Sequence, residues 1–323
     1  MNDILAILSG GDYVSGEKIS QDLGIRRAAV WKRIAQLREE GWQIEAAGRR
    51  GYRLIPGDSL DPIFWVNQLT TKTLGRAINH YEHTITSSNT LVKQMAVQGA
   101  PSGSLCLCEC QTAGKGRLGR TWSAPAGQAI LMSVLLRPKL PPKNAPLITL
   151  ATAMAMAHAV REVTGIDAQI KWPNDLVAQG KKICGMLLEM GAGMDGVEWA
   201  VIGIGINIKG NDFPEELRDK AGDLAGIAGR EIERAALVRE FLCQFERLYN
   251  QYCLGGMSAI YTLYRNRSIT LGRQVRALCP DGEYLGVAQD IDEDGTLILE
   301  TQDGERIRLR VGDVSVRGVM GYV

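Results

Sequence analysis

The sequence predicts three domains of different class: a small helical domain that ends in a hairpin, a central α/β (α+β) domain around one mixed sheet, and a small all-β domain. A chain of 323 residues is too long for one ordinary core. Its apolar pattern changes twice, from helical spacing to mixed strand-like and helix-like runs, and then to short alternating runs. The stretch "PGDSLDP" reads as a linker because it holds two prolines and a glycine. We therefore place the domains at 1–60, 61–267 and 268–323.

The first domain has the pattern of a winged helix-turn-helix. Three apolar residues of its second helix share one face at the spacing i, i+4, i+7: Val30, Ile34 and Leu37. Gly24 marks the turn before this helix, and Gly41 marks its end. The following "WQIEAAGRRGYRLI" alternates like two short strands joined at residues 48–51. Helix, turn, helix and hairpin thus follow one another in order.

The opposite face of the second helix suits a DNA groove. It presents Ala28 and Ala35 together with cationic and aromatic residues, and small residues beside a cation fit a helix that enters the major groove. Two arginines at the hairpin tip suit phosphate or minor-groove contact. The alternative is an ordinary helical domain with a solvated charged face. We predict DNA binding by Arg27, Trp31, Lys32, Arg49 and Arg50.

The central and C-terminal regions differ in their apolar runs. Strand-like runs occur at 104–110, 129–136, 168–177, 181–190 and 198–208, and helix-like runs at 88–99, 147–165 and 234–252. This mixture predicts one sheet covered by helices. From about Ser268 only short alternating runs remain, and Asp-Gly pairs at 281–282, 294–295 and 303–304 are hairpin signals. A small β-barrel is the natural interpretation of this tail.

The bulk composition is that of a soluble globular protein. It is 45% hydrophobic and 23% charged with a net charge of +1, so any DNA binding must come from a local face. The N-terminus has no basic segment before a long apolar run and is no signal peptide. The apolar stretch 145–160 falls short of the roughly 20 residues that a bilayer requires. Seven cysteines without framework spacing fit a reducing compartment. We expect a cytoplasmic protein with no membrane partner.

Two groups of metal-ligand residue types do not have the spacing of a metal site. Cys106, Cys108 and Cys110 fall on one face of a strand, which suits zinc poorly without a second Cys or His pair. His80 and His83 lack the helix and the glutamate of HExxH. We therefore expect no metal site.

Three motifs combine glycine with specific polar residues. "GKGRLGR" (114–120) puts three cations and three glycines in seven positions; a solvated basic turn is the alternative interpretation. In "KWPNDL" (171–176) a lysine follows an apolar strand directly, so partial desolvation favours an anionic partner. The glycines of "GIGIN" (203–207) allow close backbone approach. Neither the G-x-G-x-x-G pattern nor the P-loop order is present, so neither nucleotide-binding fold is indicated.

These motifs, in this order and behind a winged helix, resemble the bifunctional biotin–protein ligase and biotin operon repressor family of bacteria. The resemblance covers essentially the whole chain, and the tail looks like that family's SH3-like C-terminal β-barrel. It implies that biotin and MgATP are substrates, with no permanently bound cofactor. The biotin carboxylate would attack the α-phosphate to give biotinyl-AMP, and a lysine of biotin carboxyl carrier protein would then take the biotin. A homodimer loaded with biotinyl-AMP would bind operator DNA and repress transcription.

The resemblance also implies roles for residues of the central catalytic domain. The biotin-binding set is Ser87, Ser88, Asn89, Gln111, Lys115, Gly116, Arg117 and Lys171. Lys171, which would hold the reacting carboxyl oxygen, and Arg117, which would neutralise the adenylate phosphate, are the catalytic pair. The ATP and adenylate set is Arg117, Arg120, Trp122, Asn174 and Asn207, with Arg120 on the β- and γ-phosphates.

Two positions depart from the family pattern. Lys115 stands where arginine is common; it keeps the charge but loses the bidentate fork, so we expect activity with leakier adenylate retention. Arg26 stands where serine or threonine is frequent, and the loss of that N-cap costs about 1 kcal/mol.

Two other functions are also compatible with the sequence. The first is a ligand-sensing repressor without ligase activity, which would not need the full set of cations. The second is a lipoate-type ligase, although the polar turn at 87–89 suits a ureido ring better than a dithiolane.

Overall fold

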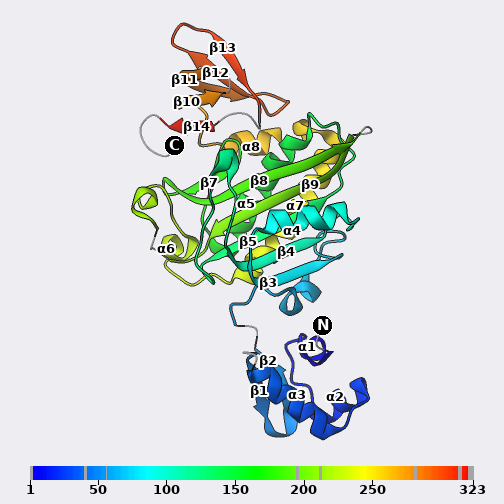
Figure 1. The fold of residues 1–323 in the computed structure, drawn as a ribbon. Coiled ribbons are helices and arrows are strands. Elements are labelled where there is room, and N and C mark those ends of the chain that lie inside the picture. Colours follow the sequence, from blue (N-terminus) through cyan, green and yellow to red (C-terminus); the bar gives the residue numbers. More distant parts are fainter. Residues whose placement is uncertain are drawn as a thin grey trace. The chain divides into compact units, whose positions relative to one another are not determined.

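The computed structural model describes residues 3–39, 42–55, 57–193, 196–210, 213–279, 282–311 and 315–318. The chain divides into two compact units, Met1–Leu69 and Thr70–Val323, and each is described by itself (Figure 1). The domain boundaries at 60/61 and 267/268 remain predictions.

The first unit contains the predicted helix-turn-helix and hairpin. Its helices are α1 (Asp3–Leu8), α2 (Gly16–Leu23) and α3 (Arg27–Glu39), and its hairpin strands are β1 (Ile44–Ala47) and β2 (Gly51–Leu54). Gly24 ends α2 in the left-handed conformation with φ 62°, as expected of a turn glycine. Val30, Ile34 and Leu37 lie in the core of this unit. The predicted helix end at Gly41 lies outside the described residues.

The second unit is built on a seven-stranded mixed sheet with the order β3-β4-β5-β9-β8-β7-β6. Among the described strand pairs of this sheet, β3 and β4 are parallel and the others are antiparallel. The strands are β3 (Asn79–Ile85), β4 (Leu105–Gln111), β5 (Ala129–Leu136), β6 (Gln169–Lys171), β7 (Asp175–Ala178), β8 (Lys181–Gly193) and β9 (Gly196–Asn207). The run 168–177, predicted as one strand, is two: the chain reverses at Trp172–Asn174 and pairs Lys171 with Asp175. Strand β3 was not predicted, because several of its polar positions are exposed.

The predicted helices cover both faces of this sheet (Figure 1). On one face, α4 (Ser88–Val97) packs on Cys106, Leu135 and Val201. The long helices α5 (Ile148–Thr164) and α7 (Arg234–Gly255) pack on each other, and α7 begins at the other face. Two short helices, α6 (Leu224–Ala228) and α8 (Tyr261–Arg267), complete the described α-helices of this unit.

The C-terminal region forms the predicted small β domain. Its five antiparallel strands have the order β13-β12-β11-β10-β14. They are β10 (Gln274–Cys279), β11 (Gly282–Ile291), β12 (Leu297–Thr301), β13 (Arg306–Leu309) and β14 (Ser315–Gly318). The β domain contacts the β6–β7 turn directly, because the Trp172 indole N–H donates to the carbonyl of Gly295 at 3.2 Å.

A buried ion pair fastens α7 to the sheet. Arg234, at the start of α7, is 2% exposed and lies 2.6 Å from the carboxylate of Glu109 on β4. The same guanidinium donates to the carbonyl of Ala129 at 3.1 Å, and the Tyr81 hydroxyl donates to Glu109 at 3.1 Å. The carboxylate therefore has several donors, which offsets part of the desolvation cost of burying it.

We predict that Arg234→Ala destabilises the protein by about 3–5 kcal/mol, because it leaves Glu109 as a buried unpaired charge. Urea unfolding measures this change. Arg239→Ala is the matched control on the same helix. Among the described residues Arg239 pairs with the exposed Glu233 at 3.5 Å, so this substitution should cost about 0–1 kcal/mol. Equal losses in the two variants would contradict a structural role of the buried pair.

Candidate functional site

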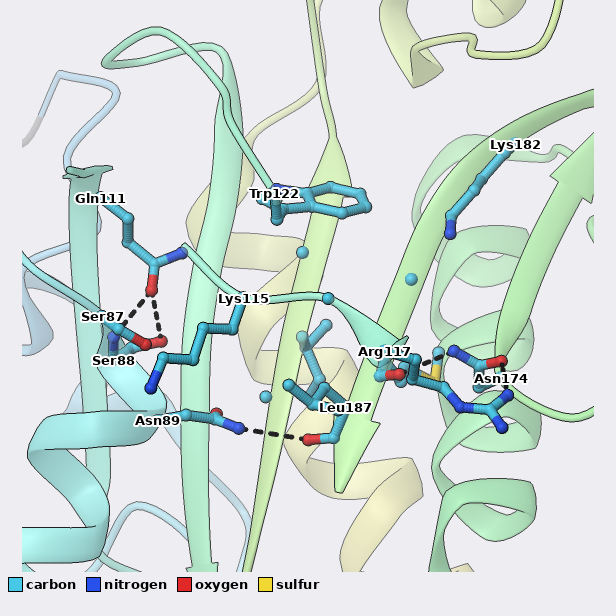
Figure 2. Close-up of a pocket in the computed structure, with 16 residues that line it drawn as sticks. Ser87, Ser88, Asn89, Gln111, Lys115, Arg117, Trp122, Asn174, Lys182 and Leu187 are labelled. Carbon is cyan, nitrogen blue, oxygen red and sulfur yellow. Dashed lines mark hydrogen bonds between the residues drawn. The ribbon is translucent and has the colours of Figure 1, made fainter. Parts of the chain in front are cut away.

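A partly open cavity lies on the α4 face of the central sheet. The start of α4, the end of β4, the loop 114–120, and the strands β8 and β9 all line it. Figure 2 shows its polar character: Gln111 and Ser88 gather on one side, and Arg117, Asn174 and Lys182 on the other.

Amide and hydroxyl groups form most of the first side, and the Lys115 side chain also lies there, 3.4 Å from the Thr90 hydroxyl of α4. The backbone N–H of Ser88 donates to Oε1 of Gln111 at 2.7 Å, which links the start of α4 to the end of β4. Ser133 of β5 donates to Oδ1 of Asn89 at 2.6 Å, and the amide of Asn89 donates to Glu189 at 2.9 Å. The predicted Ser87, Ser88, Asn89 and Gln111 all line the cavity.

Three glycines on adjacent strands form part of the cavity wall. A Cβ at Gly203 would lie closer than 3.0 Å to the Asn89 side chain, and one at Gly205 would overlap the ring of Trp122. A Cβ at Gly185 would also reach the Trp122 ring. The glycines of "GIGIN" are therefore required because the side chains of Asn89 and Trp122 approach the strands this closely. In the described residues, the buried indole N–H of Trp122 has no hydrogen-bond partner.

Two cations occupy the second side, and each is held by a neighbour from the β6–β7 hairpin. Nη1 of Arg117 donates to Oδ1 of Asn174 at 2.9 Å. Asn174 is itself fixed to β8 by a hydrogen bond from its Nδ2 to the carbonyl of Met186 at 2.8 Å. Nζ of Lys182 lies 2.6 Å from the carboxylate of Asp175 and 5.7 Å from the centroid of the Trp122 ring.

Lys182 was missed by the sequence analysis, as was Asp175. Lys182 is the second of two consecutive lysines before "ICGM", and no motif distinguishes it from its neighbour Lys181. The strand register distinguishes the two lysines, because Gly185 of β8 pairs with Asp175 and brings the start of β8 beside the hairpin. No pattern in the sequence reveals that register.

The basic loop closes over the cavity as a small hairpin. The backbone N–H of Gly116 donates to the carbonyl of Arg120 at 2.7 Å, and that of Trp122 donates to Gly114 at 3.0 Å. The predicted Lys115, Gly116 and Arg117 line the cavity. Arg120 instead lines a second, more open hollow between the loop and β8.

Two predicted site residues do not line either cavity. Lys171 is only 6% exposed and pairs across the hairpin with Asp175. Burial lowers its pKa to about 8; Asp175 opposes this shift, and Lys182, Arg120 and Arg317 of the β domain add to it. Asn207 donates to the carbonyl of Gly222 at 3.0 Å and so fastens the segment that follows β9.

The DNA-binding face predicted in the first unit is exposed. Trp31 on α3 is 66% exposed, although a large aromatic ring is usually buried. Arg27 and Lys32 are exposed on the same helix, and Arg49 and Arg50 are exposed between β1 and β2.

The described parts of the chain hold no group of three or more His, Cys, Asp or Glu side chains that could bind a metal ion. None of the described helices is both long and apolar enough to cross a membrane.

Comparison with known proteins relates all three regions to one family. Residues 81–207 match the biotin/lipoate A/B protein ligase family, 1–53 an HTH domain, and 270–317 the biotin protein ligase C-terminal domain. The bifunctional ligase/repressor BirA of Bacillus subtilis is 39% identical over 94% of each chain. That of Escherichia coli K12 is 29% identical over 97% of this chain and 96% of its own. The biotin protein ligase of Aquifex aeolicus in complex with biotin and ATP aligns with a TM-score of 0.66 at 25% identity, covering 75% of this chain and 99% of that one.

The lowered pKa of Lys171 predicts a pH-dependent stability. The unfolded lysine, with a pKa near 10.5, binds its proton more tightly than the folded one at about 8. The cost of burying the charge is therefore fully present below pH 8 and disappears as the pH rises to about 10.5. We expect the free energy of unfolding of the wild type to rise relative to Lys171→Met over this range. Urea unfolding of both proteins at several pH values measures it, and a constant difference would contradict the assignment.

Proposed function

This chain belongs to the family of bifunctional biotin–protein ligases and repressors, and from this premise we propose that it activates biotin with ATP and transfers it to a lysine of a carrier protein. The polarity of the cavity is the observation that carries the proposal. Biotin has a neutral ureido ring at one end and a carboxylate at the other. The cavity offers the amide and hydroxyl groups of Ser88, Asn89 and Gln111 on one side, where Lys115 also lies, and the cations Arg117 and Lys182 on the other. Ser88, Asn89 and Gln111 are our proposed ring partners.

The two cations suit the first chemical step. A carboxylate oxygen of biotin attacks the α-phosphorus of ATP, an O–P bond forms, and the bond to the β-phosphate oxygen breaks to release pyrophosphate. Both reactants are anionic, so their approach requires preorganised positive charge. We propose that Lys182 holds the carboxylate, because its ammonium lines the cavity, and that Arg117 neutralises the phosphate of the adenylate. The substrates supply both attacking groups, so the protein needs no nucleophile of its own.

This proposal changes three roles that the family resemblance implied. Lys182 replaces Lys171 as the partner of the carboxylate, because Lys171 lies outside the cavity lining. Trp122 lies against Gly205 beside the polar groups, so we place it beside biotin rather than adenine. We assign Asn207 no contact with ATP, because its side-chain amide donates a hydrogen bond to the carbonyl of Gly222.

The open hollow between the basic loop and β8 suits the triphosphate. Arg120 lines this hollow, and we propose that it binds the β- and γ-phosphates of the MgATP substrate. In the second step, the ε-amine of the acceptor lysine attacks the carbonyl of the mixed anhydride and AMP leaves. We propose biotin carboxyl carrier protein as the acceptor and the reducing cytoplasm as the location, where seven free cysteines are stable.

Biotin-dependent exchange of labelled pyrophosphate into ATP tests the ligase proposal. We expect Lys182→Ala to slow exchange by about 10²-fold or more, because the attacking carboxylate loses its cation. Lys181→Ala removes the neighbouring exposed lysine and is the matched control. Lys171→Ala should lose less activity than Lys182→Ala.

Two results of this experiment would contradict the proposal in different ways. Abolished exchange in Lys171→Ala with retained exchange in Lys182→Ala would return the carboxylate to Lys171. Exchange with lipoate in place of biotin would keep the enzyme and change its substrate, and exchange with neither acid would leave a ligand sensor.

The exposed face of α3 supports the second half of the proposed function, repression by a dimer loaded with biotinyl-AMP. Two winged helices in a dimer would reach two half-sites of an operator. The outer edge of β8 is a candidate dimer surface: β7 pairs with it only as far as Gly185, and no described strand pairs with its outer edge over residues 187–193. Such an edge can pair with the same edge of a second copy.

Footprinting on the regulatory DNA of biotin-biosynthesis genes, with biotin and MgATP present, tests this half. We expect protection that Lys32→Ala weakens at every salt concentration, because one phosphate or base contact is lost. Lys72→Ala removes an exposed lysine of the other unit and should bind as the wild type does. Absence of selective protection at physiological salt would remove the repressor function and leave the ligase intact.

A further inference from the structure

The wing, defined as the β1–β2 hairpin 44–54, is tied to the segment between α1 and α2. Val14 and Tyr52 exchange two backbone hydrogen bonds of 2.8 and 2.9 Å. Gly51 has a φ of 103°, and a Cβ there would lie closer than 3.0 Å to the carbonyl oxygen of Val14. The wing can therefore approach this segment only with glycine at position 51.

Tyr13, next to this bridge, contacts two arginines of the wing. The guanidinium carbon of Arg50 lies 4.4 Å from the centroid of its ring, and that of Arg53 lies 4.8 Å away. The Tyr13 hydroxyl is hydrogen-bonded to Glu45, which raises the pKa of Tyr13 and lowers that of Glu45. The ring is thus oriented by both strands of the wing.

The two arginines on this ring differ in their charge balance. Arg53 lies 2.7 Å from the carboxylate of Glu45, so its charge is compensated. Arg50 is exposed and forms no ion pair with any of the described residues. Its guanidinium contacts the Tyr13 ring instead. Arg49, beside it, makes no ion pair, side-chain hydrogen bond or ring contact within the described ranges. Only one of the two arginines predicted at the wing tip is therefore held in place.

We propose that Tyr13 is a positioning residue for DNA binding, whose ring holds the Arg50 guanidinium ready for a backbone phosphate. The inference rests on the proposed DNA-binding function of this unit. A guanidinium that lies over an aromatic ring and forms no ion pair has N–H groups available for the fork-like contact that phosphate accepts. A side chain ordered in advance also loses less conformational entropy on binding.

A double-mutant cycle on the full chain tests this role. A labelled DNA duplex of mixed sequence is titrated in a series of KCl concentrations, with biotin and MgATP present. We expect Tyr13→Leu to weaken binding about two- to fivefold, the range of an exposed cation–π contact. Tyr13→Phe keeps the ring and should bind as the wild type does. Arg50→Ala should lower the slope of log K against log salt by about 0.9, as expected for one lost phosphate contact.

The cycle separates positioning from folding. Adding Tyr13→Leu to Arg50→Ala should cause no further loss, because the residue that Tyr13 positions is already absent. An equal loss in both backgrounds would show that Tyr13 only stabilises the unit, and a loss in Tyr13→Phe as large as in Tyr13→Leu would assign the effect to Glu45; either result overturns the proposal. A wild type that exchanges pyrophosphate but binds no duplex overturns the DNA-binding function itself, and this inference with it.

Discussion

The register between β8 and β9 determines where the cavity can form. It sets Gly185 opposite Gly205 and Leu187 opposite Gly203, so three glycines face α4 over a short length of the sheet. A Cβ at Gly203 or Gly205 would meet Asn89 or Trp122 at separations that real Cβ atoms essentially never show, and one at Gly185 would lie 3.0 Å from the Trp122 ring. The polar turn at the start of α4 and the indole beside it can approach the sheet this closely because these three positions carry no side chains.

The β6–β7 hairpin organises the charged side of the cavity. Its turn and first β7 residue supply Asn174 and Asp175, which hold Arg117 and Lys182 respectively. Neither Asn174 nor Asp175 is a cation; each fixes the position of a cation from another segment. The same hairpin contacts the C-terminal β domain through Trp172 and Gly295, so the positions of these cations depend on elements more than 100 residues apart in sequence.

The cations proposed to bind anions are positioned differently in the two units. In the second unit, carboxamide and carboxylate partners hold partly buried cations whose desolvation would otherwise be costly. In the first unit, the cations are exposed, and an aromatic ring orders one of them at a small desolvation cost. Because the net charge is only +1, anion binding at both sites depends on locally arranged cations rather than on the electrostatic field of the whole chain.

The sequence by itself determined the three regions, most of the strands and helices, the helix-turn-helix core at Val30, Ile34 and Leu37, and the polar and glycine-rich motifs of the cavity. These features follow from local periodicity and from residue types that need a particular backbone, and both can be read along the chain. Only the tertiary structure separated Lys171 from Lys182, turned "KWPND" into a hairpin, and placed the guanidinium of Arg50 over the ring of Tyr13. These outcomes depend on strand register and on contacts between distant segments, for which a single sequence carries no local signal.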